Sequence, residues 1–335
     1  MSGGGAILAS LLVTIGRPTW WLLALTGFLV RGGFVVFTLP IVILPSPLAI
    51  SDAVGPAVVP IALGRVGIDA IALLVIAVAI LFAWLIVAGW IAAATDLALI
   101  REAAAAAIEE GVGAPAVAAS DGRDRTILRR LLLARLIAWL PFAAALAVGT
   151  VRIVAIVYAQ LTRPAEVASP LALRVALDAA PELVVIAVSW LLGELIGGMA
   201  GRRIVLGGAP PGQALIAAAG DVVRRPRAVV LPWVLTTGLL LTILAGSIGA
   251  AGIAWSRIVL ALTDRPVDPR TVALNVILFV AIWLAALVLA GLFAAFRGSV
   301  QTFEAVRRQS ATGTFGASAH HRPGDWSIPD EGGSL

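Results

Sequence analysis

Three charged residues that interrupt long apolar segments are the first candidates for chemistry in this sequence. Arg31 lies inside WWLLALTGFLVRGGFVVFTLPIVIL (residues 20–44), while Arg152 and Glu194 interrupt two later apolar runs. A charged side chain at the centre of a membrane-spanning helix costs about 2.5–3.5 kcal/mol on insertion scales, so it usually faces other helices, an opposite charge or water. We therefore predict that these residues line a polar interior that binds an anionic or zwitterionic group, such as a lipid headgroup.

The depth of each charge along its helix predicts how the charges pair. At about 1.5 Å per residue, Arg31 and Glu194 differ in depth by roughly 8 Å, which two extended side chains can bridge. Glu194 is therefore the expected partner of Arg31, and Arg135 is a rival partner for Glu194. Gly32 and Gly33 weaken the helix directly beside Arg31, as expected where backbone lines a cavity.

Arg152 is expected to pair separately from Arg31. It lies toward the opposite face of the membrane, at the depth of Glu182 and Asp178, and we include Glu182 in the predicted polar interior. A structural interpretation is the alternative for all of these charges: ion pairs can fix the register of helices without binding a ligand.

The residue types that most enzymes use for catalysis are scarce. The sequence contains no cysteine and no lysine, which excludes disulfides, thiolate metal sites, Schiff-base chemistry and a P-loop lysine. The only histidines, His320 and His321, are adjacent near the C-terminus and lack further ligands for a metal shell. We therefore predict no catalytic residue, no metal and no cofactor, and a membrane enzyme is the least favoured of the functional alternatives.

The composition defines the class of protein. Of 335 residues, 60% are hydrophobic and 13% are charged, with a mean hydropathy of +1.03. Soluble domains are typically about 45–50% apolar and about 25% charged. The chain is therefore predicted to be an integral membrane protein in contact with the phospholipid bilayer. Its net charge of +5 comes from arginines in the connections between apolar runs, which indicates membrane topology rather than nucleic-acid binding.

Six apolar runs are long enough to cross a bilayer, which takes about 20 residues. They cover roughly 20–44, 68–95, 136–160, 181–200, 228–256 and 272–296. We predict an all-α polytopic fold with six transmembrane helices arranged as three hairpins. Residues 1–310 form this domain. The N-terminus lacks a basic region and a cleavage site, so we expect the first span to stay in the mature chain.

The distribution of arginines predicts the orientation of the chain. Sixteen arginines fall in the N-terminus, 97–135, 201–227 and 297–335, against six in the opposite connections. The positive-inside rule then places both termini in the cytoplasm. Exclusive use of arginine, with abundant alanine and glycine, is typical of a GC-rich bacterial genome, so we predict a multi-pass protein of the bacterial inner membrane.

Two basic segments precede the third and fifth runs and are predicted to form amphipathic surface helices. They cover residues 121–139 and 210–233. Their arginines at the expected membrane surface are Arg125, Arg129, Arg130, Arg224 and Arg225. Basic amphipathic helices lie at the headgroups and attract anionic lipid, so we expect each segment to turn from the surface into its span.

A stripe of glycines predicts close helix packing in the fourth run. Gly193, Gly197 and Gly201 are spaced by four residues, which places them on one helical face. This small-xxx-small pattern lets two helix backbones approach closely. The partner helix belongs either to this chain or to a second copy in a homo-oligomer.

The last segment, residues 311–335, is predicted to be a disordered cytoplasmic tail. It is rich in Gly, Ser and Pro and has few aliphatic residues. Trp326 lies in this tail without a folding role. One interpretation is a docking motif for a cytoplasmic protein partner, and another is a tryptophan that touches the membrane.

Weak internal similarity accompanies the hairpin pattern. Residues 6–23 align without gaps on 214–231, which superimposes Arg17-Pro18 on Arg225-Pro226. The chain has six predicted spans, basic helices before the odd-numbered spans, an RRP sequence at the entry to the fifth span and a first span interrupted by arginine and glycine. In these features it resembles a broad group of six-span bacterial membrane proteins. These are similar to the membrane domain attached to some glycerophosphodiester phosphodiesterases. The resemblance carries over no catalytic residue, because the phosphodiesterase domain with its metal ligands is absent from this sequence.

These observations lead to two functional hypotheses. The first is a membrane protein of the transport or lipid-handling class, acting alone or as the membrane subunit of a larger system. The second is a non-transporting scaffold or assembly factor that recruits a cytoplasmic partner. The predicted polar interior supports the first hypothesis, and the predicted tail supports the second.

Overall fold

The computed structural model describes residues 3–34, 37–38, 68–112, 124–162, 171–263 and 268–312. Within these residues the regular structure is entirely helical, with no strand. Five of the helices are long and apolar enough to cross a membrane, and a sixth span is obtained if one bent helix pair is counted as a unit. The prediction of an all-α, multi-pass membrane protein is confirmed at this level.

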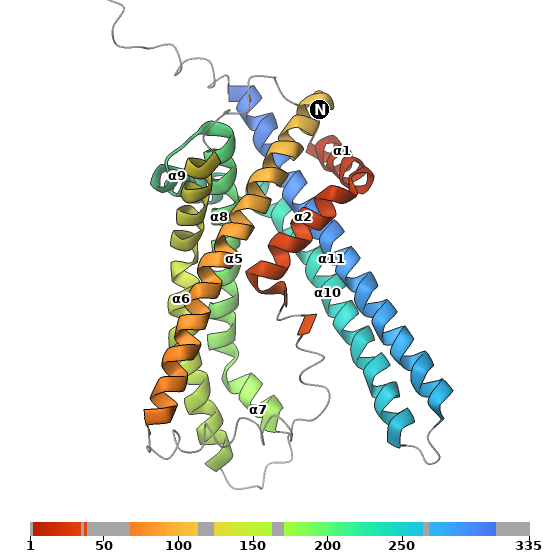
Figure 1. The fold of residues 1–335 in the computed structure, drawn as a ribbon. Helices are drawn as coiled ribbons and strands as arrows, with labels where there is room; N and C mark the ends of the chain where they lie inside the picture. Colours follow the sequence, from red (N-terminus) through yellow and green to blue (C-terminus); the bar gives the residue numbers. More distant parts are fainter. Residues whose placement is uncertain are drawn as a thin grey trace, which may run out of the picture.

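Five long helices each contain one of the predicted apolar runs and continue beyond it. They are α5 (Ile68–Glu109), α6 (Asp124–Thr162), α8 (Ala180–Gly207), α10 (Pro226–Thr263) and α11 (Pro269–Thr312). The short helices α7 (Leu171–Asp178) and α9 (Pro211–Arg224) lie near opposite ends of the bundle (Figure 1). Several of the long helices extend well past the expected spans at the end that carries α9, so polar residues there belong to helices rather than to loops.

The described part of the first predicted span is the second member of a bent helix pair. Helix α1 (Gly3–Gly16) stops at Arg17, and α2 (Pro18–Phe28) starts at an angle of 97° to it. Proline lacks the backbone N–H that would continue α1, which accounts for the break. One turn of π-helix, η1 (Leu29–Gly33), follows, with Gly32 at a φ of 110° inside it. Residues 35, 36 and 39–44 of the expected span lie outside the described part.

The same helix–arginine–proline–helix order recurs later in the chain. Helix α9 ends at Arg224, Arg225 has φ −136° and ψ 53°, and Pro226 begins α10. Arg17, before Pro18, has φ −122° and ψ 81°. The two aligned segments therefore share a local backbone break.

The expected surface helix at 121–139 is not separate from the third span. Asp124–Thr162 is a single helix, so Arg125 and Arg129 lie on the exposed first turns of α6. Residues 124–140 contain no glycine or proline, and leucine, arginine and alanine are all good helix formers. Nothing in the sequence breaks the helix there, so the expected turn from a surface helix into the span is not seen.

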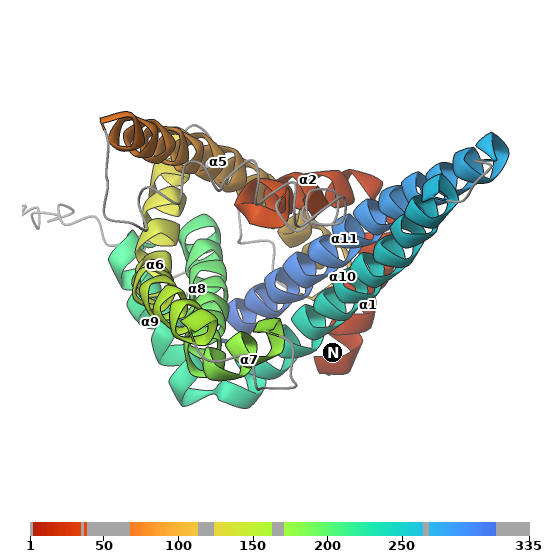
Figure 2. The same ribbon diagram turned by 90° about the horizontal axis from the view of Figure 1, so that it is seen from below.

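The long helices converge at one end and separate at the other. Helix α6 packs along α8, α10 packs along α11, and α2 packs against both α5 and α11. Away from the α1 and α9 end, the α10–α11 pair diverges from α5, α6 and α8 (Figures 1 and 2). Side chains from all of these groups therefore meet only at the convergent end.

Glycines on α8 permit its close contact with α6. A Cβ atom at Gly193 would lie 2.9 Å from the carbonyl oxygen of Ala138, and one at Gly197 would lie 3.3 Å from the Ala138 side chain. Gly201 faces Leu131 at a similar distance of 3.3 Å. The glycine stripe thus packs within this chain.

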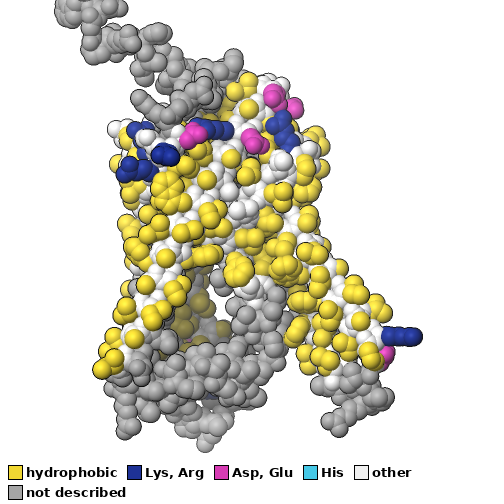
Figure 3. Space-filling model, viewed as in Figure 1, with side chains coloured by type: hydrophobic (Ala, Val, Ile, Leu, Met, Phe, Trp, Pro, Cys, Tyr) yellow, Lys and Arg dark blue, Asp and Glu magenta, His cyan; other side chains and the backbone are white. Residues whose placement is uncertain are grey.

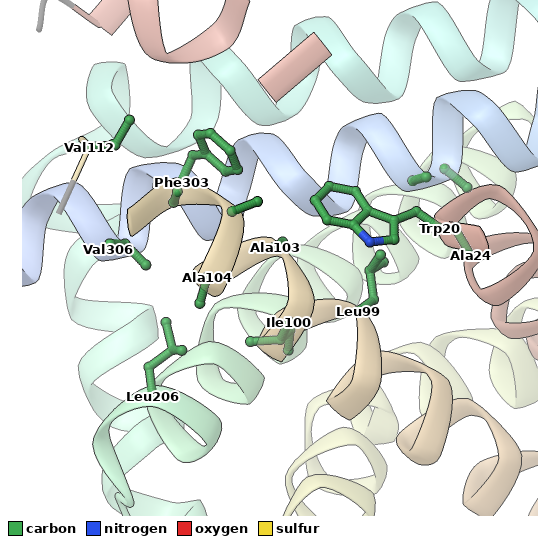
Figure 4. Close-up of a cluster of buried hydrophobic side chains, with 14 residues drawn as sticks. Trp20, Ala24, Leu99, Ile100, Ala103, Ala104, Val112, Leu206, Phe303 and Val306 are labelled. Carbon is green, nitrogen blue, oxygen red and sulfur yellow. The ribbon is translucent and has the colours of Figure 1, made fainter. Parts of the chain in front are cut away.

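The main apolar core lies at the convergent end (Figure 4). Trp20, Phe303 and Val306 are completely buried there, together with small alanines of α5 such as Ala103. The Trp20 Nε1–H donates a hydrogen bond to Glu102 Oε2 at 2.6 Å. This core holds α2, α5 and α11 together directly beside the charged residues described below.

Large apolar side chains cover much of the outside of the bundle, while charged side chains gather at the convergent end (Figure 3). Val151 of α6 and Ile277 of α11 are each more than 60% exposed. An apolar exterior of this extent would be unstable in water, and it matches the lipid-facing surface of membrane helices. The helices therefore contact lipid.

Candidate functional site

Six charged side chains meet where five helical segments converge, and we call this group the buried arginine cluster. Its members are Arg31 of η1, Asp96 of α5, Arg135 of α6, Glu194 and Arg202 of α8, and Arg297 of α11. They line a cavity of about 50 Å³. One water needs about 10–15 Å³ of such space, so the cavity has room for several waters or a small polar group.

Asp96 is held by two arginines from different helices. Arg31 Nη1 donates to both Asp96 carboxylate oxygens at 2.9 Å. Arg135 Nη2 donates to Asp96 Oδ2 at 2.5 Å. Charge-assisted contacts of this length are among the stronger hydrogen bonds in proteins. Asp96 therefore links α5 to η1 and α6.

Glu194 is the second carboxylate of the cluster and is only 9% exposed. It accepts longer contacts from Arg135 Nη1 at 3.3 Å and from Arg297 Nη2 at 3.5 Å. Arg135 therefore bridges the two carboxylates. The long contacts around Glu194 leave this side of the cluster less tightly paired than the side around Asp96.

Arg202 is held in the cluster by neutral groups alone. Its side chain is 8% exposed and donates to the carbonyl oxygens of Gly198 and Gly298 at 2.7 and 2.8 Å. Its Nε–H donates to Thr302 Oγ1 at 3.1 Å. A guanidinium has five N–H donors, so these three bonds leave two donors without a partner among the described residues.

The cluster contains more positive than negative charge. Four guanidiniums face two carboxylates, which is a formal excess of two positive charges. Buried charges are costly unless an opposite charge compensates them. The geometry therefore favours a bound anionic group, and Arg202 has the donors to receive it.

A larger cavity of about 520 Å³ adjoins the cluster between α8, α9, α10 and α11, and we call it the basic cavity. Arg202 and Gln301 line both cavities. The basic cavity also contains Arg203, Arg224, Arg225, Arg308, Asp221 and Glu304. Leu195, Met199, Val229 and Pro232 form an apolar wall of the same cavity. The cluster and the basic cavity, which has both charged and apolar walls, thus share lining residues.

The structure brings Arg31 and Glu194 into one cluster but does not pair them. Arg31 binds Asp96 instead, and the rival partner Arg135 binds Glu194. Arg31 reaches Asp96 because α2 packs against α5, which the sequence could not show.

Arg152 and Glu182 lie outside the cluster. They pair with each other at 3.4 Å, and the Arg152 side chain is 69% exposed. Arg152 is about 25 Å along α6 from Arg135, at 1.5 Å per residue. The expected single polar interior is therefore divided into a buried cluster and a distant, exposed ion pair.

The basic residues predicted at the membrane surface fall into two places. Arg125 and Arg129 are exposed at the start of α6, and Arg130 Nη1 donates to the Gly208 carbonyl oxygen at 3.0 Å. Arg224 and Arg225 are exposed and line the basic cavity. Trp326 and the two histidines lie outside the described residues.

Sequence reasoning missed Asp96, Arg202 and Arg297 as site residues. Each lies just past the end of a predicted span, so it was assigned to a connection and, for the arginines, counted as a topology signal. The signal that could have found them is the absence of proline from 68–109, 182–207 and 272–312, which lets those helices continue through the charged positions.

No protein-family model, curated protein or solved structure matches this chain. The resemblance to six-span bacterial membrane proteins therefore stays a prediction. Among the described residues, no group of three or more His, Cys, Asp or Glu side chains is placed to hold a metal ion. The site is accordingly characterised by its arginines and by the two adjoining cavities.

Proposed function

We propose that this chain is an anion-binding membrane protein of the lipid-handling class, with the buried arginine cluster as its binding site. One observation carries the proposal: four guanidiniums, that of Arg202 buried and the other three mostly buried, face only two carboxylates. A cluster whose only role was to fix helix register would need no charge excess, because matched pairs lower the cost of burial. An anionic ligand would supply the missing negative charge.

Arg202 supports this function more directly than the paired arginines. Its guanidinium is buried and oriented by three bonds to neutral acceptors, so no carboxylate among the described residues occupies its remaining donors. Arginine presents a planar set of donors that matches phosphate and carboxylate oxygens. Arg202 also lines both cavities, so a ligand in the basic cavity could contact a guanidinium of the cluster.

We further infer the membrane placement that this function requires. The spans form three hairpins, the arginine-rich convergent end faces the cytoplasm of a bacterial inner membrane, and α1 and α9 lie at the headgroups there. The packing of α6 with α8 and of α10 with α11 supports the hairpins. The excess of arginine at one end supports the orientation.

The experiment that tests the function is extraction in native lipid with a membrane-solubilising polymer, followed by mass spectrometry of the lipids. We expect enrichment of an anionic phospholipid over the bulk membrane, and loss of that enrichment in Arg202→Gln. Arg152→Gln, which removes an exposed arginine far from the cluster, is the matched control. Equal lipid profiles for wild type and Arg202→Gln would reject the proposal, and stoichiometric recovery of a cytoplasmic protein without lipid enrichment would favour the scaffold hypothesis.

A further inference from the structure

The basic cavity has two walls of opposite chemical character. One wall carries arginines from α8, α9 and α11, and the other is formed by Leu195 and Met199 of α8 with Val229 and Pro232 of α10. At about 520 Å³ it is within the size range of small-molecule sites and much larger than the cavity inside the cluster. A ligand that fills it must therefore be charged on one side and apolar on the other.

The arginines of this cavity are only partly neutralised by its acidic residues. Arg203 pairs with Asp221 at 2.5 Å, and Arg308 pairs with Glu304 at 3.0 Å. Arg224 and Arg225 have no ion-pair partner among the described residues, and Arg202 is bonded to neutral acceptors. The cavity therefore keeps an excess of positive charge that is available to an anion.

The break between α9 and α10 produces this arrangement. Arg224 is the last residue of α9, Arg225 leaves helical geometry, and Pro226 starts α10. The arginines consequently stand at the junction, and Val229 and Pro232 follow on the first turns of α10. A short surface helix and a spanning helix thus place charge directly beside an apolar helix face.

We propose that the basic cavity binds the headgroup of an anionic glycerophospholipid. Arg224, Arg225 and Arg202 bind its phosphate, and an acyl chain lies along the apolar wall. The proposal rests on the proposed function, because Arg202 belongs to both sites. Basic pockets between membrane helices bind lipid headgroups by the same combination of charge and apolar contact. A soluble phosphate ester would use the arginines but would leave the apolar wall without a partner.

The test measures phosphatidylglycerol bound to the full chain in phosphatidylcholine nanodiscs that contain a small fraction of phosphatidylglycerol, read out by native mass spectrometry. The variant is Arg224→Gln with Arg225→Gln. The matched control is Arg257→Gln with Arg270→Gln, which removes the same charge from exposed positions of α10 and α11 outside the cavity. We expect about 10–30-fold weaker retention in the variant and less than about twofold change in the control.

The outcomes separate this inference from the function on which it rests. Wild-type retention by the Arg224/Arg225 variant, together with loss of retention in Arg202→Gln, would overturn the headgroup site and leave the cluster function intact. No enrichment of phosphatidylglycerol by the wild type would overturn both. Full displacement of the lipid by soluble glycerol phosphate would identify a soluble anion as the ligand and overturn the lipid assignment.

Discussion

The charge excess of the buried arginine cluster can be tested by changing it in both directions. Arg202→Gln lowers the formal excess from two to one while keeping amide donors for the Gly198 and Gly298 carbonyls. Glu194→Gln raises the excess to three with almost no change in shape. If the cluster binds an anion, the two substitutions must act in opposite directions on affinity.

The size of each effect follows from simple electrostatics. A hydrogen bond to a charged group is worth about 1.5–3 kcal/mol, so loss of the Arg202 charge should weaken anion binding by about 10–100-fold. Glu194 and Arg202 are eight residues apart on α8, which is about 12 Å at 1.5 Å per residue. For an anion at Arg202, removal of the Glu194 charge is therefore worth about 1.4 kcal/mol at an effective dielectric constant of about 20. Binding to Glu194→Gln should therefore be stronger by on the order of tenfold.

The assay is the shift in melting temperature that phosphatidylglycerol produces in phosphatidylcholine nanodiscs. A ligand that binds the native state raises stability by RT ln(1 + [L]/Kd), so the shift should shrink in Arg202→Gln and grow in Glu194→Gln. Generic misfolding would reduce the shift in both variants. Changes of the same sign in the two variants would refute the charge-excess argument.

Three further predictions concern the framework of the site. Gly193→Val should lower the melting temperature by several degrees, because its Cβ would lie 2.9 Å from a carbonyl oxygen of α6, whereas Gly220→Ala, with open space around it, should be neutral or stabilising. Trp20→Phe should destabilise the protein by about 1–3 kcal/mol in denaturant titrations, because Glu102 loses its indole donor. Arg152→Gln should change stability by less than about 1 kcal/mol and leave phosphatidylglycerol binding unchanged in the nanodisc assay, because its contact with Glu182 is long, at 3.4 Å, and its side chain is 69% exposed.

Hydropathy was sufficient to predict the class of the fold and the centres of the long helices. The apolar runs are continuous, and only helices can satisfy their backbone groups in lipid, so few alternatives remained. The ends of the helices were less predictable. A span length of about 20 residues placed the boundaries near 95, 200 and 296, whereas α5, α8 and α11 continue to Glu109, Gly207 and Thr312.

These helical turns beyond the predicted boundaries hold most of the site residues that the sequence analysis did not identify. Arg202 and Arg297 were interpreted as cytoplasmic charges because a rule that counts arginines cannot distinguish an exposed loop from a buried helix face. Asp96 was missed for the same reason. Arg31 and Glu194, inside apolar runs, were recognised because the surrounding sequence makes their charge costly.

The pairing within the cluster depends on tertiary contacts that no single-helix pattern contains. Each ion pair of the cluster joins different helices: Arg31 meets Asp96, and Arg297 meets Glu194. The depth of a charged residue along its helix shows which partners lie at the same level, but it does not show which helices are neighbours. Which helices are neighbours must come from packing, here from the contact of α2 with α5 and from the core around Trp20.

The cluster also lies where the two diverging parts of the bundle are joined. Arg202 of α8 binds Gly298 and Thr302 of α11, and Glu194 of α8 faces Arg297 of α11. Away from this end, the α10–α11 pair separates from α5, α6 and α8 (Figure 2). An anion at Arg202 would therefore contact the junction between the two parts.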